Sequence, residues 1–377
     1  MKYINIRNPS LMLPVIVLAV GVALAGPSGD RPDANHPWAV HDENRPIPPH
    51  VQTAEGRPPS DAIVLFDGTQ ESIDRNWCGD GGKPTKWTVR DGTFVCTPKS
   101  GGVGTRRRFG DCQIHVEFKI PDPPGPGLGN SGVYVQHYEV QVIDSSVPMA
   151  SFDPPWQQAN YADGMLGAVY GQNPPLVNAA RRPGEWQSYD IVFHPVVWDG
   201  DALKAPARIT VFANGVLVQD NFPLEGSTDW GLRARHNRGM ETPEGCLYLQ
   251  DHGNPVAYRN IWVRELPSSA KKPDGDALRK TLAKKTLSLA ENTDDLAKRL
   301  VWLWESYCYV PNDNVKDRID KATVEYVNRL QALPGKLDDK TRKEMLNMAR
   351  FVRMGVRNGL FAEDCPLVIA VRAQIKK

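Results

Sequence analysis

The sequence predicts a mainly β protein in which a sandwich of two antiparallel sheets, residues 62–266, precedes a small all-α C-terminal domain, residues 272–377. Three observations lead to this fold class. Residues 62–266 contain short runs of alternating apolar and polar residues separated by turn residues, as antiparallel strands do. We find no helical segments between these runs, whereas a doubly wound α/β fold would need them. The C-terminal residues instead repeat their apolar side chains with a helical period.

Residues 1–25 have the pattern of a signal peptide. Lys2 and Arg7 supply positive charge, residues 11–24 are apolar, and Ala23-Leu24-Ala25 is a small-x-small cleavage site. Pro14 interrupts the apolar run, which is shorter than the ~20 residues of a spanning helix. We therefore expect export to the periplasm or the extracellular space, with no membrane span after cleavage.

Residues 26–61 are predicted to form a Pro-rich linker. The stretch from Gly26 to Ser60 contains eight prolines and has no apolar periodicity. Such a composition is typical of an extended and poorly ordered segment.

The sandwich is predicted from its strand and hairpin signals. In QIHVEFK, residues 113–119, Ile114, Val116 and Phe118 fall on one face. Asn214-Gly215 lies between two further alternating runs, and this pair is a strong hairpin signal because both turn positions need positive φ. Several strands with one apolar and one polar face each imply two packed sheets.

The tail is predicted to be helical. Leu296, Leu300, Leu303 and Tyr307 follow one helical stripe, and Met345, Ala349, Val352 and Val356 follow another. Thr293 is the expected N-cap of the first stripe, and Pro334-Gly335 separates the helices. No feature of the tail identifies a partner.

Charge and cysteine content limit the class of protein. The net charge of +1 argues against a nucleic-acid partner, because a surface that follows phosphates needs an excess of Lys and Arg. The six cysteines allow disulfides in an exported protein, and buried free thiols are the alternative.

Polar residues cluster on two strand-like segments. In YEVQVID, residues 138–144, Glu139 and Gln141 share one face while Val140 and Val142 take the other. In CLYLQDHG, residues 246–253, Tyr248, Gln250 and His252 share a face in the same way. Two such strands side by side would form the floor of a binding or catalytic pocket.

The same segment invites comparison with the E-x-D-x-x-E strand of retaining β-glucanases. Gln141 would replace the helper carboxylate and Asp144 the acid. Strict alternation turns Asp144 to the apolar face, so the comparison requires a β-bulge. A retaining mechanism also needs carboxyl groups about 5–5.5 Å apart, which the short Asp144 side chain makes harder.

Several motifs together resemble the 3-keto-disaccharide hydrolase domain family over about residues 62–266. They occur in that family's order and are LFDG (65–68), W-x-V-x-D-G (87–92), NSGVYVQ (130–136), YEVQVID (138–144), GAVY (167–170), PGEWQSYDI (183–191), NG (214–215) and LQDHGNPVAYRNIWVREL (249–266). The resemblance implies a concanavalin-like jelly-roll sandwich, the fold of lectins and glucanases. It also implies cleavage of 3-keto-glycosides.

This chemistry requires particular groups. A ketone at C3 makes the C2 proton acidic, so a base can expel the C1 oxygen by elimination, after which water adds. The residues offered as base and acid are Glu139 and His252, in an open order, with Asp144 as a third candidate. A divalent cation bound by Glu139, His252 or Asp144 is the alternative stabiliser of the enolate.

Substrate-binding candidates come from amides and aromatic residues. Asn130, Gln141 and Gln250 are candidate hydrogen-bond donors to the sugar. Tyr138 and Trp156 are candidates for stacking on it, as are Tyr134 and Tyr170.

We expect an enzyme that cleaves 3-keto-disaccharides, with two rivals. One is a non-catalytic carbohydrate-binding module, because the same fold hosts lectins. The other is a β-glucanase acting on unoxidised sugars.

Overall fold

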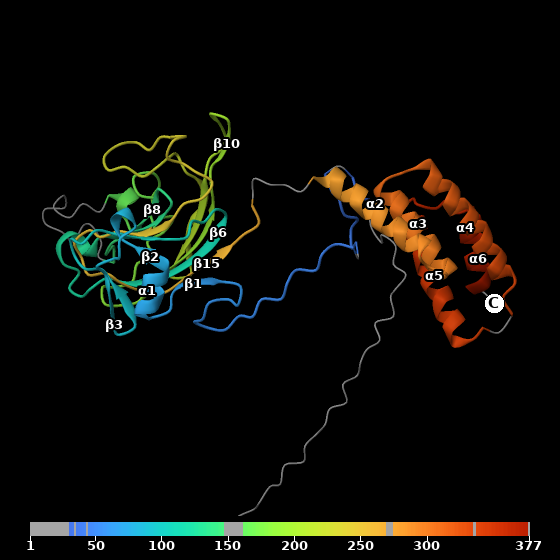
Figure 1. Ribbon diagram of the computed structural model, residues 1–377, viewed down its shortest axis with the longest axis horizontal. Coiled ribbons are helices and arrows are strands. Elements are labelled where there is room, and N and C mark those ends of the chain that lie inside the picture. The colour runs from blue at the N-terminus through green and yellow to red at the C-terminus, as the bar shows by residue number, and fades with distance from the viewer. Residues whose placement is uncertain are drawn as a thin grey trace, which may run out of the picture. The chain divides into compact units, whose positions relative to one another are not determined.

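The computed structural model describes residues 30–33, 35–42, 44–146, 161–268, 274–334 and 337–375. The predicted signal peptide and Trp156 lie outside these residues. The chain divides into two compact units (Figure 1). Among the described residues, the sandwich unit comprises those from 49 to 268, and the helical unit comprises those from 30 to 48 together with those from 274 to 375.

The sandwich unit consists of two antiparallel sheets. The larger sheet has eight strands in the order β13-β12-β9-β6-β15-β4-β3, with β1 paired to β15, and the smaller has the order β2-β5-β14-β7-β8. The larger contains β1 (Ile63–Phe66), β3 (Thr88–Arg90), β4 (Thr93–Val95), β6 (Cys112–Lys119), β9 (Gln187–His194), β12 (Arg208–Ala213), β13 (Val216–Pro223) and β15 (Ala257–Glu265). The smaller contains β2 (Trp77–Cys78), β5 (Val103–Thr105), β7 (Ser131–Val135), β8 (Tyr138–Val142) and β14 (Leu247–Leu249). A separate hairpin joins β10 (Val197–Asp199) and β11 (Ala202–Ala205).

Alternation along the strands builds one core between the sheets. Every second residue of β6 is buried, which confirms the predicted inward face. The ring of Tyr138 on β8 lies 5.7 Å from that of Phe193 on β9, so the two sheets face each other. Asn214 and Gly215 have φ of 54° and 80° between β12 and β13, as the hairpin signal predicted. The predicted fold class, a jelly-roll sandwich followed by a small all-α domain, is confirmed.

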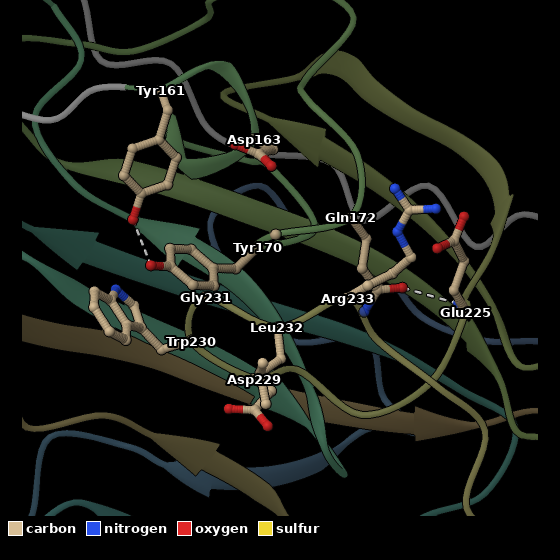
Figure 2. A pocket seen from close by; sticks show the side chains of 11 residues that line it. Tyr161, Asp163, Tyr170, Gln172, Glu225, Asp229, Trp230, Gly231, Leu232 and Arg233 are labelled. Atoms are coloured by element: carbon tan, nitrogen blue, oxygen red, sulfur yellow. Dashed lines mark hydrogen bonds between the residues drawn. The ribbon is translucent and has the colours of Figure 1, made fainter.

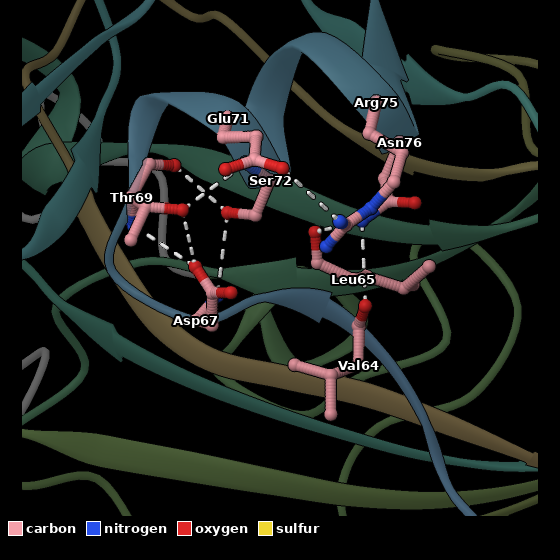
Figure 3. Close-up of polar contacts among 8 residues, drawn as sticks. All are labelled: Val64, Leu65, Asp67, Thr69, Glu71, Ser72, Arg75 and Asn76. Atoms are coloured by element: carbon pink, nitrogen blue, oxygen red, sulfur yellow. Dashed lines mark hydrogen bonds and ion pairs between the residues drawn. The ribbon is translucent and has the colours of Figure 1, made fainter.

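One short helix in the sandwich unit was not predicted. Helix α1 (Gln70–Asn76) follows β1, and Thr69 is its N-cap because the Thr69 hydroxyl accepts a hydrogen bond from Ser72 N (Figure 3). The Asp67 carboxylate holds that cap by accepting hydrogen bonds from Thr69 N at 3.0 Å and Thr69 Oγ1 at 2.6 Å. With seven residues, α1 is too short to show a helical period in the sequence.

The helical unit contains the tail and has its own core. Its helices are α2 (Gly275–Glu291), α3 (Leu296–Tyr309), α4 (Asp313–Gln331), α5 (Asp339–Arg357) and α6 (Pro366–Ile375). Leu296, Leu300 and Leu303 are buried along the predicted stripe. The expected N-cap is wrong by two residues, since Asp295 accepts hydrogen bonds from Ala297 N and Lys298 N.

The helical unit also includes part of the Pro-rich segment. Arg31 donates a hydrogen bond to Gly359 O, and Tyr309 Oη donates one to Asp42 Oδ2 at 2.6 Å. The described residues from Asp30 to Pro48 form neither helix nor strand, which agrees with the prediction of an irregular segment. They nevertheless belong to the compact unit of the helices rather than to a uniform linker.

Two further expectations can be compared with the described residues. All six cysteines are described, and all six are free thiols. None of the helices in the described ranges has the length and apolar character needed to cross a membrane.

Candidate active site on the smaller sheet

The candidate site lies on three adjacent strands of the smaller sheet. The predicted polar segments form β8 and β14, but β7 runs between them rather than leaving them side by side. The register pairs Tyr248 with Tyr134 and Tyr134 with Glu139. These three side chains therefore form one row across β14, β7 and β8, and β7 supplies its central tyrosine.

Glu139 is the carboxylate of this row, and burial shifts its pKa strongly. Its residue is only 4% exposed, and Tyr134 Oη donates a hydrogen bond to its Oε2 at 2.6 Å. Burial raises the pKa of the Glu139 carboxyl to about 7, although the Tyr134 hydrogen bond acts to lower it. Gly132 leaves room for this carboxylate, because a Cβ there would collide with Glu139 Oε1. Glu139 can therefore exchange a proton near neutral pH.

Two amide side chains that flank strands of this sheet, Asn130 before β7 and Gln250 after β14, have unused acceptors. Gln250 Nε2 donates to Tyr134 Oη at 3.3 Å, while Gln250 Oε1 is buried and has no hydrogen-bond partner among the described residues. Asn130 Oδ1 is buried without a described partner as well. Buried acceptors are costly unless a donor pairs with them, and a sugar hydroxyl is such a donor.

Gln141 lies on the same face, but its side-chain oxygen already accepts a hydrogen bond from the neighbouring backbone. Gln141 is 2% exposed, and its Oε1 accepts a hydrogen bond from Val142 N at 3.1 Å. Its backbone also fixes the loop that follows, since Gly167 N donates to Gln141 O. These contacts hold the edge of β8 in place.

Asp144 is not placed on the face of β8 that carries Glu139. Strand β8 pairs with β7 from Tyr138 to Val142 without a register shift, so the bulge required by the β-glucanase comparison does not occur between them. Asp144 follows the strand, and its Oδ1 accepts hydrogen bonds from Ser146 N at 2.9 Å and Ser146 Oγ at 2.6 Å. Its carboxylate thus organises a turn, as Asp commonly does.

Tyr138 has a packing role, and its interpretation as a sugar contact is wrong. Alternation turns Tyr138 to the face opposite Glu139, where its ring is 1% exposed and packs against Phe193. Its hydroxyl donates to the buried carboxylate of Glu241 at 2.6 Å. Period-two geometry alone would have excluded this residue.

His252 lies in the exposed turn after β14. Asn254 Nδ2 donates hydrogen bonds to both His252 O and Asn130 O, which brings these two backbones together at the end of the site. Among the described residues, no group of three or more His, Cys, Asp or Glu side chains could hold a metal ion. Glu139, His252 and Asp144 therefore do not form such a group together.

A hollow of about 700 Å³ lies next to two segments that hydrogen-bond to the outer edge of β8. Figure 2 shows the residues that line it. Glu139 N donates to Thr228 Oγ1 and Tyr170 N donates to Glu139 O, so both neighbouring segments attach at Glu139. The hollow is lined by Tyr161, Asp163, Tyr170, Gly171, Gln172, Glu225, Asp229, Trp230, Gly231, Leu232 and Arg233. Of these, only Tyr170 was among the candidates predicted from the sequence. The tryptophan in the loop sequence STDWGLRAR was the available signal for the rest.

Comparisons with known proteins agree with this architecture. A "3-keto-disaccharide hydrolase" of Bacteroides thetaiotaomicron is 26% identical over 240 residues, which cover 54% of this chain and 78% of the relative. The crystal structure of a presumed glycosyl hydrolase from Parabacteroides distasonis is 35% identical and superposes with a TM-score of 0.51. That match covers 60% of this chain and 97% of the other.

The family comparison covers the whole sandwich. Residues 61–264 match the family described as the 3-keto-alpha-glucoside-1,2-lyase-like domain, nearly the range over which the sequence motifs indicated the resemblance. On this match, the chain is a member of the 3-keto-alpha-glucoside-1,2-lyase-like domain family.

Proposed function

We propose that the sandwich cleaves 3-keto-glycosides, with Glu139 as the general base that removes the C2 proton. The observation that carries this proposal is a buried carboxyl group whose pKa is raised to about 7 and which is linked, through the Tyr134 hydroxyl, to Gln250, an amide with an unpaired buried oxygen. A base with a pKa near the working pH combines a useful ionised fraction with real basicity. The family membership supplies the substrate class.

The proposed reaction has two stages. Glu139 takes the C2 proton, the electron pair enters the C2–C3 bond as the C3 oxygen becomes an enolate oxygen, and collapse of the enolate breaks the C1–O bond. The leaving oxygen takes up a proton. Water then adds across C1 and C2, which gives net hydrolysis. Asn130 and Gln250 would orient the sugar through their free acceptors.

Tyr134 has the role of a positioning residue. Burial, and then the Glu139 charge, raise the pKa of the Tyr134 phenol, so it stays a neutral donor at neutral pH. Its hydrogen bond holds one oxygen of Glu139 and stabilises the ionised form. The sequence left the order of base and acid open; with Glu139 as the base, His252, whose backbone lies beside that of Asn130, takes the role of acid for the leaving oxygen.

The test is turnover of a 3-keto-disaccharide by the full chain. We expect Glu139→Gln to reduce kcat by about 10²–10⁴-fold, the usual contribution of a general base. Glu305→Gln is the matched control, since Glu305 is a buried glutamate of the helical unit and should leave kcat unchanged. Sugar binding without turnover by the wild type would favour the carbohydrate-binding module instead. Release of sugar from unoxidised laminarin would favour the β-glucanase.

We also propose that the protein is exported, on the basis of its first 25 residues. The expected outcome is a mature chain beginning after Ala25 in the periplasmic or extracellular fraction. Recovery of full-length protein from the cytoplasm would contradict it.

A further inference from the structure

The hollow beside β8 exposes large apolar side chains, two of them aromatic. Trp230 is 80% exposed, Leu232 66% and Tyr161 42%. In Figure 2 the rings of Tyr161, Tyr170 and Trp230 lie on one side of the hollow, with Gln172, Glu225 and Arg233 on the other. Aromatic rings left in water beside polar groups are typical of a binding surface, and sugar C–H groups pack well on such rings.

The position of the hollow relates it to Glu139. Asp229 and Trp230 directly follow Thr228, whose hydroxyl accepts the hydrogen bond from Glu139 N at 3.0 Å. Tyr170 N donates to Glu139 O at 3.1 Å on the same strand edge. A ring bonded to the sugar over Glu139 would therefore reach this hollow, and about 700 Å³ falls within the usual range for ligand pockets of about 300–1,000 Å³.

The charges of the hollow select among possible rings. Asp163, Glu225 and Asp229 contribute three carboxylates, and Arg233 contributes one guanidinium, which leaves a formal charge of −2. Carboxylates accept hydrogen bonds from sugar hydroxyls but repel a second anion in a shared site. This lining suits an uncharged ring and disfavours a uronate or a sulfated sugar.

We propose that this hollow is the subsite for the leaving-group sugar and that it selects an uncharged hexose over an anionic one. Trp230 provides the stacking surface, and the three carboxylates provide the selection. This assignment rests on the proposed cleavage of 3-keto-glycosides. It adds the second half of the substrate to the site formed by Glu139, Tyr134, Gln250 and Asn130.

The experiment compares three substrates with the full chain. They are a 3-keto-glucosyl-glucose, the same compound with glucuronic acid as the leaving group, and methyl 3-keto-glucoside, which has no second ring. For Trp230→Ala we expect kcat/KM for the neutral disaccharide to fall about 5- to 10-fold, as loss of an aromatic contact worth about 1 kcal/mol or slightly more implies. The methyl glycoside should be unaffected. Trp186→Ala is the control, because Trp186 packs against Lys119 and Arg259. This variant should leave kcat/KM unchanged for both substrates.

Charge selection has its own readout. The wild type should prefer the neutral leaving group over glucuronate by about 10-fold or more at low salt, and the preference should shrink as salt is added. Asp163→Asn combined with Asp229→Asn should reduce that preference by at least about 3-fold. Equal wild-type efficiency on both disaccharides would overturn the charge selection. An equal effect of Trp230→Ala on the disaccharide and the methyl glycoside would overturn the subsite.

Failure of the proposed function is distinguishable from failure of the subsite. If the wild type cleaves none of the three compounds, the proposed function is wrong. Binding of the neutral disaccharide, followed by tryptophan fluorescence, then decides the subsite. Quenching that is present in the wild type and lost in Trp230→Ala supports it, and quenching that persists in the variant overturns it.

Discussion

The two units of this protein each contain a buried carboxylate bonded to a tyrosine hydroxyl, and the two pairs have opposite consequences. Tyr134 donates to Glu139 in the sandwich unit and Tyr309 donates to Asp42 in the helical unit, both at 2.6 Å. Asp42 also accepts hydrogen bonds from Ala39 N and Asn44 N. Among the described residues, only Tyr134 donates a hydrogen bond to the Glu139 carboxylate.

The comparison shows that the other groups around a carboxylate determine what its hydrogen bond to a tyrosine does. A buried carboxylate that accepts hydrogen bonds from several donors ties chain segments together. A buried carboxyl group with one donor keeps a raised pKa and remains available for proton transfer. The pair in the helical unit attaches the N-terminal segment to α3, while the pair in the sandwich unit forms part of the candidate active site.

The largest effects should come from the two cores, which are separate. Phe94 contacts Phe66, Trp77 and Trp87 in the sandwich core, so Phe94→Ala should cost about 3–5 kcal/mol. Leu300→Ala in the helical core should cost about 2–5 kcal/mol. Calorimetry of the full chain should show two transitions, each lowered by one variant. A single transition lowered by both variants would show that the units unfold together.

An intermediate effect is expected at the pair in the helical unit. Tyr309→Phe removes a hydrogen bond to a buried carboxylate, which is worth about 1.5–3 kcal/mol, and should lower only the transition of the helical unit. It should also increase proteolysis of residues 30–48. Turnover of 3-keto-glycosides should stay at the wild-type level. A loss of turnover matching that of Glu139→Gln would contradict the separation of roles.

The smallest free-energy change is expected at the pair in the sandwich unit. The base must be ionised, so kcat/KM should fall as the pH drops below about 7. Tyr134→Phe removes the hydrogen bond that lowers the Glu139 pKa, so the inflection should move to higher pH by about one unit, or ~1.4 kcal/mol. An inflection that stays in place while activity falls would mean that Tyr134 acts in another way.

Local patterns in the sequence predicted most of the architecture. The alternation in residues 113–119, the Asn214-Gly215 turn and the apolar stripe through Leu300 each depend on neighbours within a few residues, and all three are confirmed. The same local rules placed Glu139 and Gln141 on one face of β8. Helix α1 escaped detection because a helix of seven residues shows no periodicity.

Strand order and loop placement depend on contacts between residues far apart in the chain, which no local pattern encodes. Only the tertiary structure decided that β7 lies between β8 and β14, that Tyr134 meets Glu139, and that the loop with Trp230 lies beside them. The raised pKa of Glu139 has the same origin, because desolvation is produced by the surrounding packing rather than by the residue type. The sequence alone thus determined which side chains share a face of each strand. The reactivity of Glu139 was decided by the tertiary structure, because segments far apart in the chain pack around this carboxyl group and exclude water from it.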